Sequence, residues 1–305
     1  MTDWRAELGD ALGDKVEFNA PLANKVAFKI GGPADAFAKP VNADDLAHIL
    51  RIADGANLPI TILGTGSNVL VSDKGIRGIT VRLSGALTEV VLLDENSDFG
   101  VLRVGSGALN PPVVNTALQN SLIGIEFLAT IPGTFGGALI MNAGAHGGEI
   151  GPFVEKVNVL VPGLGEVTRA GADCGFSYRN SSFSPSEIIT ESVLRIPKGD
   201  AEKARAHLKE MRSHRRATQP IREPNAGSIF KNPQGDYAGR LIEACGLKGM
   251  RKGGACISPK HANFIVNENS ATATDVSDLA EVARRAVRAK FSVDLHWEVK
   301  RIGEW

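Results

Sequence analysis

The stretch Ile131-Pro-Gly-Thr-Phe-Gly-Gly-Ala-Leu-Ile-Met-Asn-Ala-Gly-Ala-His-Gly-Gly-Glu-Ile-Gly151 contains seven glycines among its twenty-one residues, where a frequency of about 7% is usual. Glycine at this density indicates backbone that takes φ > 0 or lies hard against another group. The N–H groups of such turns form concavities that hold anions, most often phosphate. Tight turns between strands are the competing interpretation, and the glycine count alone does not separate the two.

A second glycine loop, Gly64-Thr-Gly-Ser-Asn68, directly follows the apolar run Pro59-Ile-Thr-Ile-Leu63. Two strand-flanked glycine loops could hold one extended diphosphate from opposite sides. A dinucleotide-binding fold of the Gly-x-Gly-x-x-Gly type needs a third glycine and a helix directly after it. Here leucine stands at the third position and a β-branched stretch follows. A simple nicotinamide-binding domain of that type is therefore not expected.

Composition narrows the class of protein further. The 305 residues include 34 Lys plus Arg and 34 Asp plus Glu, and this zero net charge argues against a general nucleic-acid binder. The three cysteines, Cys174, Cys245 and Cys256, form no CxxC pair, so neither a disulfide framework nor a zinc site is indicated. The first residues lack the apolar core of a signal peptide, and no apolar run approaches the ~20 residues that span a bilayer. We expect a soluble, cytoplasmic protein.

Periodicity and capping residues predict alternating helices and short strands. Residues up to Ala27 are expected to form a helical or loose lead-in. The expected helices are a segment capped by Asn42 and running to Ala53, one that begins near Asn110, Asp200–Ala217, one near Tyr237–Cys245, and one capped by Thr274. The expected strands are residues 28–32, 34–41, 59–63, 69–71, 79–83, 88–93, 100–104, 156–161, 166–170, 188–196, 263–266 and 292–302.

Several motifs together resemble a known family. Gly64-Thr-Gly-Ser-Asn-Val-Leu-Val, Ile131-Pro-Gly-Thr-Phe-Gly-Gly-Ala and Met141-Asn-Ala-Gly-Ala-His-Gly-Gly-Glu are similar to the FAD-binding domain of the vanillyl-alcohol-oxidase/p-cresol-methylhydroxylase (PCMH) superfamily. Within it they resemble the UDP-N-acetylenolpyruvoylglucosamine reductases. Three further motifs follow in the order of that family, and the match runs from about Asn24 to the C-terminus. They are Tyr178-Arg-Asn-Ser-Ser-Phe183, Asn225-Ala-Gly-Ser-Ile-Phe-Lys-Asn-Pro233 and Glu298-Val-Lys-Arg-Ile-Gly303.

The resemblance implies an α+β fold with a two-lobed PCMH-type FAD-binding domain and a C-terminal α+β substrate-binding domain. The expected boundaries are residues 1–27 for an N-terminal segment, 28–197 for the FAD-binding domain (lobes 28–75 and 76–197) and 198–305 for the substrate-binding domain, whose last strand could return to the flavin. The resemblance also implies noncovalent FAD. The expected flavin neighbours are Gly64, Thr65, Gly66, Ser67, Asn68, Val69, Gly133, Thr134, Gly136, Gly137, Asn142, Ala143 and Gly144.

The family reaction implies the roles of three residues. NADPH reduces the flavin, and hydride then reaches the enolpyruvyl ether of a UDP-sugar, which yields UDP-N-acetylmuramate for peptidoglycan. Ser228 matches the proton donor, Arg179 matches the arginine that holds the substrate carboxylate, and Glu298 matches the catalytic acid near the same carboxyl. Each residue taken alone is more simply explained by local structure: a turn serine, a surface arginine, and an exposed strand position.

Substrate contacts are expected from Tyr178, Arg215, Arg216, Lys231 and Asn232. The basic residues among them supply the cations that the UDP diphosphate needs. A basic helix end at His214-Arg215-Arg216 is explained equally well by the helix dipole. The short interval between Arg179 and Ser228 indicates the branch of the family without an inserted tyrosine loop. The sequence therefore does not identify the residue that covers the bound substrate. No metal site is expected, because His146 has no partners at ligand spacing.

Small molecules, the UDP-sugar and NADPH, are the expected partners, with no nucleic acid, no membrane and a monomeric state. Two alternatives remain open at this stage. One is a flavin oxidase of the same superfamily, and the other is a flavin- or nucleotide-binding protein without catalysis.

Overall fold

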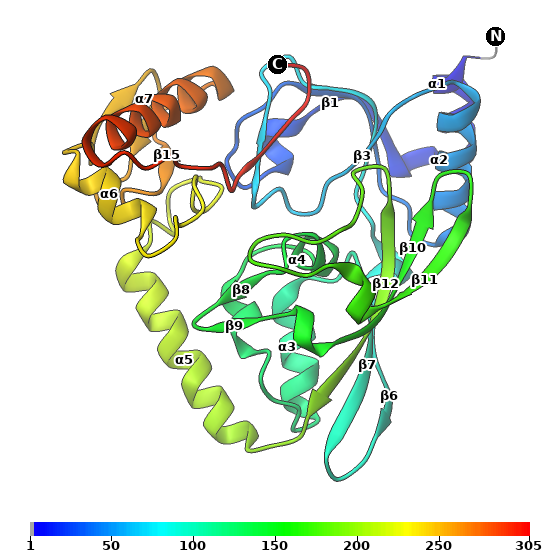
Figure 1. The fold of residues 1–305 in the computed structure, drawn as a ribbon. Coiled ribbons are helices and arrows are strands. Elements are labelled where there is room, and N and C mark those ends of the chain that lie inside the picture. The colour runs from blue at the N-terminus through cyan, green and yellow to red at the C-terminus, as the bar shows by residue number, and fades with distance from the viewer. Residues whose placement is uncertain (1–2) are drawn as a thin grey trace. The chain divides into compact units, whose positions relative to one another are not determined.

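The computed structural model describes residues 3–305, whose helices and strands are shown in Figure 1. The chain forms two compact units, each built from three stretches of sequence. Unit 1 contains the N-terminal segment through Glu17, then Phe37–Gly64 and Ile79–Ser213. Unit 2 contains Phe18–Ala36, Thr65–Gly78 and His214–Trp305.

A five-stranded sheet forms the main layer of unit 1, in the order β11-β10-β12-β7-β6. Neighbouring strands in this sheet pair antiparallel. Helices α3 and α4 contact the sheet at β6, β7 and β12, and Figure 1 shows both helices beside it. The bounds are β6 Val90–Glu95, β7 Phe99–Gly105, α3 Asn110–Gln119, α4 Phe135–Ile140, β10 Val154–Val161, β11 Gly165–Ala170 and β12 Ile188–Pro197.

The core of unit 1 lies between that sheet and its helices. Every second residue of β7 faces this core, as Leu102 and Val104 show with no exposed surface, which is the period of a half-buried strand. Phe135 at the start of α4 is also fully buried. Leu208 and Met211 of helix α5 (Ala201–Thr218) join the same cluster.

The remaining elements of unit 1 include α1 (Trp4–Leu12), which contacts α2 (Ala43–Gly55). The side chain of Asn42 caps α2 by accepting a hydrogen bond from the Asp45 N–H at 2.8 Å.

A four-stranded sheet has the order β1-β2-β5-β3, in which β3 and β5 are parallel. Its bounds are β1 Val16–Pro21, β2 Pro33–Ala38, β3 Ile60–Ile62 and β5 Ile76–Val81.

Unit 2 packs helices α6 and α7 against one another and α7 against a small antiparallel sheet of β13, β14 and β15. A second hydrophobic cluster fills this unit, and its fully or almost fully buried members include Phe28, Phe230 and Val276. In addition, β4 and β16 pair in parallel. The bounds are β4 Val69–Val71, α6 Ala238–Ala244, β13 Arg251–Lys252, β14 Ala255–Ile257, β15 Ile265–Asn267, α7 Ala273–Phe291 and β16 Lys300–Ile302.

Most of the elements expected from the sequence are present, and the α+β class is confirmed. The strand expected at residues 28–32 is wrong, because Lys29 has φ +53° and Gly31 has φ +138°. The strand expected at 292–302 is confirmed only at β16, since Ser292 takes the left-handed conformation that ends α7. The lead-in contains both a helix and a strand, α1 and β1. The predicted domain boundaries remain predictions.

Candidate active site

Ser228 follows a turn that its own sequence motif builds. The Asn225 side chain accepts a hydrogen bond from the Gly227 N–H at 2.9 Å, which is the local turn chemistry favoured by asparagine. Gly227 itself has φ +79°. The turn interpretation and the proton-donor interpretation of Ser228 are therefore compatible, because the turn leads directly into a short extended segment that begins with Ser228.

That segment, residues 228–230, lies between two other extended segments of unit 2. On one side Ser228 forms an antiparallel bridge with Phe264, and on the other Phe230 forms one with Trp297. The Glu298 N–H donates to the Ile229 C=O at 2.8 Å. Two residues assigned to catalysis, Ser228 and Glu298, thus stand on adjacent segments although they are far apart in the sequence.

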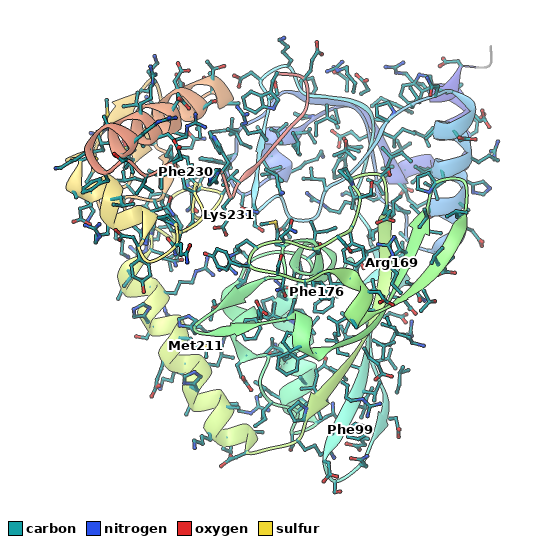
Figure 2. The ribbon with its side chains drawn as sticks, viewed as in Figure 1. Phe99, Arg169, Phe176, Met211, Phe230 and Lys231 are labelled. Atoms are coloured by element: carbon teal, nitrogen blue, oxygen red, sulfur yellow. The ribbon has the colours of Figure 1, made fainter. Side chains whose placement is uncertain are left out.

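Phe230 is buried among these paired segments. Its side chain is 1% exposed, and its ring lies 5.7 Å from the Trp297 ring, centroid to centroid. Figure 2 labels Phe230 together with its chain neighbour Lys231. The Lys231 N–H donates to the His296 C=O at 2.8 Å, so the pairing continues past the buried phenylalanine to Lys231, one of the predicted substrate-binding residues.

Asn68 ties the second glycine loop to the segment that carries Glu298. Its side-chain Nδ2 donates to the Glu298 C=O at 3.3 Å, and its C=O accepts from the Lys300 N–H at 3.0 Å. The pairing then continues from Val69 into β4 and β16. The last strand thus pairs with the strand that follows the glycine loop, within unit 2, and its return to the flavin remains a prediction.

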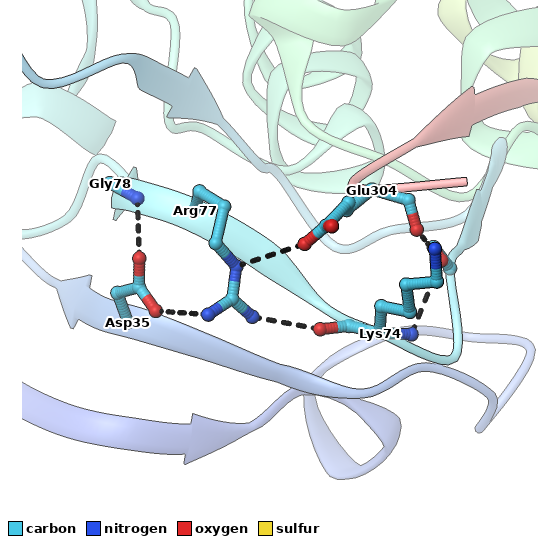
Figure 3. A network of polar contacts seen from close by, with 6 residues as sticks. Asp35, Lys74, Arg77, Gly78 and Glu304 are labelled. Atoms are coloured by element: carbon cyan, nitrogen blue, oxygen red, sulfur yellow. Dashed lines mark hydrogen bonds and ion pairs between the residues drawn. The ribbon is translucent and has the colours of Figure 1, made fainter.

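A polar network anchors the end of β16 (Figure 3). Arg77 pairs with Asp35 at 2.6 Å, donates to the Lys74 C=O at 2.8 Å and lies 3.8 Å from a Glu304 carboxylate oxygen. The Ser72 hydroxyl hydrogen-bonds to the Glu304 C=O. Because these bonds flank both β4 and β16, they fix the strand that follows Glu298.

Arg179 occupies a tight turn in unit 1. Ser177 and Asn180 exchange two backbone hydrogen bonds of 3.0 Å each, which leaves Tyr178 and Arg179 at the tip. Arg179 has φ +54°, an uncommon conformation for a residue with a side chain. Its guanidinium carbon lies 5.2 Å from the centre of the Tyr178 ring. Observed backbone strain of this kind is often associated with a functional position.

The side chain of Asn142 hydrogen-bonds to the first residue of that turn, Ser177. It has no exposed surface, and its Nδ2 donates to the Ser177 C=O at 3.1 Å and to Glu149 at 3.0 Å. Its Oδ1 accepts from the Gly151 N–H at 2.9 Å. The carboxamide therefore makes internal bonds with both donor hydrogens and with its oxygen. The observed role of this side chain is therefore structural.

The glycine loop at residues 64–68 fits a group that needs close backbone approach. A Cβ on Gly66, which has φ +66°, would lie 2.5 Å from a Val26 side-chain carbon, and one on Gly64 would lie 2.4 Å from the Thr134 hydroxyl oxygen. The hydroxyl of Thr65 is buried and has no hydrogen-bond partner within residues 3–305. The crowding explains why both positions need glycine, and the unpartnered Thr65 hydroxyl is a group that a bound phosphate could hydrogen-bond.

The other glycine segment is built around α4. Gly133 and Thr134 precede the helix, and Gly136 and Gly137 lie in its first turn. The N–H of Gly136 donates to the Ser106 C=O at 2.9 Å. Ala143 is buried, and Gly144 begins a two-residue strand pair, β8 (Gly144–Ala145) with β9 (Gly148–Glu149). Like the Thr65 hydroxyl, the hydroxyl of Ser106 is buried and has no hydrogen-bond partner among the described residues.

The predicted cations of unit 2 lie at the end of α5 and beyond Phe230. Arg215 is half-buried, its pKa is lowered by burial, and its Nε donates to Gln219 at 3.0 Å. Arg216 is exposed, and its C=O accepts from Lys260. The Asn232 Oδ1 accepts from the Ala238 N–H at 3.1 Å, and Ala238 is the first residue of α6.

Nothing in the sequence alone marked Asn263, yet it is central to the pairing around Ser228. Asn263 is 3% exposed, and its carboxamide bonds to both backbone groups of Phe230. The Asn263 N–H donates to His261 Nδ1 at 3.2 Å. Burial lowers the pKa of His261, which favours the neutral ring that can accept this bond.

Comparison with known proteins connects these observations to a family. A relative from Symbiobacterium thermophilum, UDP-N-acetylenolpyruvoylglucosamine reductase 2, is 43% identical over 92% of this chain and 90% of its own length. The chain belongs to the UDP-N-acetylenolpyruvoylglucosamine reductase family. A reductase of that name from Anaeromyxobacter sp. (strain K) is 40% identical over 99% of this chain and 90% of its own.

Two family models and a crystal structure agree with this membership. Residues 219–302 match the C-terminal domain of UDP-N-acetylenolpyruvoylglucosamine reductase, and residues 34–171 match an FAD binding domain. The crystal structure of the reductase from Thermus caldophilus has a TM-score of 0.79 and 34% identity, and covers 92% of this chain and 97% of that one. The cofactor of this reductase family member is FAD, as predicted.

Within residues 3–305, no helix is both long and apolar enough to cross a membrane. The same residues contain no group of three or more His, Cys, Asp or Glu side chains that could hold a metal ion.

Proposed function

We propose that this protein reduces the enolpyruvyl group of UDP-N-acetylglucosamine enolpyruvate to give UDP-N-acetylmuramate, with NADPH as the hydride donor, in peptidoglycan precursor synthesis. Family membership at 43% identity supports the reaction. The observation that carries the residue assignments is the pairing of the Ser228 and Glu298 segments, with the Glu298 N–H on the Ile229 C=O at 2.8 Å.

The bound FAD, once reduced by NADPH, supplies the hydride that adds to the alkene carbon remote from the carboxylate. Residues of this chain then stabilise and protonate the negative charge that hydride addition leaves on the substrate. The electron pair lies on the carboxyl-bearing carbon as an enolate, and Ser228 donates its hydroxyl proton to that carbon. The serine alkoxide regains a proton from solvent, so the proton count balances.

Arg179 and Glu298 act on the same carboxyl group in this proposal. A guanidinium suits a planar two-oxygen anion, because it binds both oxygens and stays charged. Glu298 has to be protonated or share a hydrogen bond, since a bare carboxylate beside the enolate would repel it. Stabilisation of developing charge is usually the largest contribution to catalysis.

The proposed flavin contacts follow from the loop geometry. The crowded glycines Gly64 and Gly66, and the orphaned hydroxyl of Thr65, support a diphosphate contact at residues 64–69. The second group of proposed contacts is Gly133, Thr134, Gly136, Gly137, Ala143, Gly144 and the backbone of Asn142. The UDP diphosphate is assigned to Arg215, Arg216 and Lys231, and the sugar to the Nδ2 of Asn232 and the ring of Tyr178.

Ser228→Ala tests the proton-donor role. We expect unchanged flavin reduction by NADPH, and flavin reoxidation by the enolpyruvyl UDP-sugar slowed by roughly 10²- to 10⁴-fold, the usual contribution of a general acid. Anaerobic stopped-flow spectroscopy measures both half-reactions. Ser277→Ala, on α7, is the control. Equal loss in both half-reactions would remove Ser228 from this role.

We also propose that the protein acts in the cytoplasm as a monomer. The free thiols support a reducing compartment, since Cys174 and Cys256 are buried and unpaired. Size-exclusion chromatography with light scattering at working concentration tests the monomer, and a mass of two chains would contradict it. Slow reaction of the reduced flavin with oxygen would separate this reductase from a flavin oxidase.

A further inference from the structure

Asn263 holds the backbone beside Ser228 with its carboxamide. The side-chain Nδ2 donates to the Phe230 C=O at 2.8 Å, and the Oδ1 accepts from the Phe230 N–H at 3.0 Å. The Asn263 C=O accepts from the Ile229 N–H at 2.8 Å. Three hydrogen bonds from one residue therefore fix the two residues that directly follow Ser228.

The chemistry of these bonds requires a carboxamide. Phe230 presents a C=O and an N–H, so its partner needs a donor and an acceptor side by side. A carboxylate of the same shape would place an acceptor oxygen against the Phe230 C=O. Both residues are buried, with Asn263 3% exposed and Phe230 1%, so a lost partner is not simply replaced by bulk water.

The opposite edge of the same segment is held by the strand that carries Glu298. The Ile229 C=O accepts from the Glu298 N–H at 2.8 Å. The Ser228 side chain itself has no hydrogen-bond partner within residues 3–305. The place of its hydroxyl is therefore set by the backbone on which it stands, and Asn263 is the side chain that fixes that backbone.

We propose that Asn263 is a positioning residue for the protonation step: its paired bonds to Phe230 hold the Ser228 backbone in register with the Glu298 strand, so that the hydroxyl is aligned for proton transfer. This inference rests on the proposed role of Ser228. A displacement of about 1 Å in a reacting group can cost on the order of 100-fold in rate, so the proton transfer is the step that loses most.

Asn263→Asp tests this role in the FAD-loaded enzyme. We expect reduction by NADPH to change by less than about twofold and reoxidation by the enolpyruvyl UDP-sugar to slow by roughly 10- to 100-fold. The solvent deuterium isotope effect on reoxidation should rise, because protonation becomes more rate-limiting. Flavin content and the melting temperature are measured alongside, and Asn263→Ser is the second variant if the aspartate does not fold.

Asn267→Asp is the matched control in the same unit. Its Nδ2 donates to the Phe28 C=O at 3.2 Å and its Oδ1 accepts from the Ala271 N–H at 2.9 Å, so the same atom change breaks similar anchors away from Ser228. Its reoxidation rate should match the wild type. Equal slowing in the Asn263 and Asn267 variants would show a general loss of stability and overturn the proposal.

The double variant Ser228→Ala/Asn263→Asp separates positioning from a structural effect. If Asn263 acts through the Ser228 hydroxyl, the double variant reoxidises no more slowly than Ser228→Ala alone. Multiplied rate losses would overturn the inference. Failure of the wild type to reoxidise with the UDP-sugar would instead contradict the proposed function, and a full-speed Ser228→Ala would contradict only the donor assignment.

Discussion

At the scale of single residues, buried asparagines connect distant parts of the chain. The carboxamide of Asn142 uses both of its hydrogens and its oxygen, and one of these bonds reaches the Ser177 C=O at the base of the Arg179 turn. Asn142 also has φ +39°, a conformation that asparagine tolerates better than most residues with a side chain. Its conformation and its bonds therefore favour the same residue type.

Asn142→Ala should lower the free energy of unfolding by about 2–4 kcal/mol, because it removes three hydrogen bonds of a fully buried side chain. Urea titration of the apoprotein, followed by circular dichroism, measures this loss. Asn120→Ala is the control, since its Nδ2 makes a single bond, to the Thr116 C=O at 2.8 Å, and a loss of about 1 kcal/mol is expected. Losses of the same size in both variants would contradict the special place of Asn142.

At the scale of elements, the start of α7 shows how a helix is fixed from within and from outside. Thr272 and Asp275 form a reciprocal capping box, in which each side chain accepts from the backbone N–H of the other at 3.0 Å. In addition, Asp73 accepts from the N–H groups of Ala273 at 2.7 Å and Thr274 at 3.1 Å. Two carboxylates thus stand at the positive end of the helix dipole.

The stability of α7 should therefore depend on pH. The hydrogen bond from the Thr272 N–H holds the pKa of Asp275 below its usual value of 3.8. A carboxyl whose folded pKa is lowered stabilises the fold above its unfolded pKa, and this contribution is lost as the pH falls through the folded pKa. Asp275→Asn should thus be less stable than the wild type near neutral pH, with a difference that shrinks below pH 3.8.

Urea titrations of the wild type and of Asp275→Asn, from about pH 6 to about pH 2.5, measure that difference. Asp278→Asn, one turn along the same helix, is the control. Its ion pair with Lys252 at 3.2 Å is exposed, so less than about 1 kcal/mol should be lost. A constant gap between wild type and Asp275→Asn across this range would contradict the role of the charge.

The same helix shows what sequence could and could not predict. The N-cap of α2 at Asn42 and the start of α3 near Asn110 are predicted correctly, because the signals lie within a few residues. The cap of α7 was placed at Thr274, and Thr272 is the residue observed. Asp275, three positions after Thr272, is the capping-box signal. Its presence distinguishes the two threonines, so the information was present in the sequence.

The site divides in the same way. The motifs around Ser228 and Glu298 are contiguous, so resemblance could assign them. Asn263 was missed because its partners, Ile229 and Phe230, are distant in the sequence and only the fold brings them together. The full internal use of the Asn142 side chain was likewise invisible, since Ser177 is thirty-five positions away.

At the scale of the whole molecule, bound FAD should stabilise the folded chain. A ligand that binds only the folded chain adds stability by mass action, about 2.7 kcal/mol when its free concentration is 100 times its dissociation constant. The melting temperature of the apoprotein should therefore rise with added FAD.

Gly66→Ala should reduce this rise by more than half and lower the flavin content of the purified protein. A Cβ there meets Val26 at 2.5 Å, and φ is +66°. Gly163→Ala is the control, because Gly163 has φ +77° but open space around a Cβ. The control shares the backbone strain without the crowding. Visible absorbance and thermal shift measure both variants, and equal FAD responses would rule out the glycine-loop assignment.

The parallel pairing of β4 with β16 has a consequence for biosynthesis. Asn68, beside β4, is separated from Glu298 by 230 residues, which corresponds to roughly 10–50 s of translation. Throughout that interval the nascent chain presents β4 without this neighbour, and a bare strand edge invites association with other polypeptides. Ribosome-associated chaperones should therefore matter more for the yield of this protein than its modest size suggests.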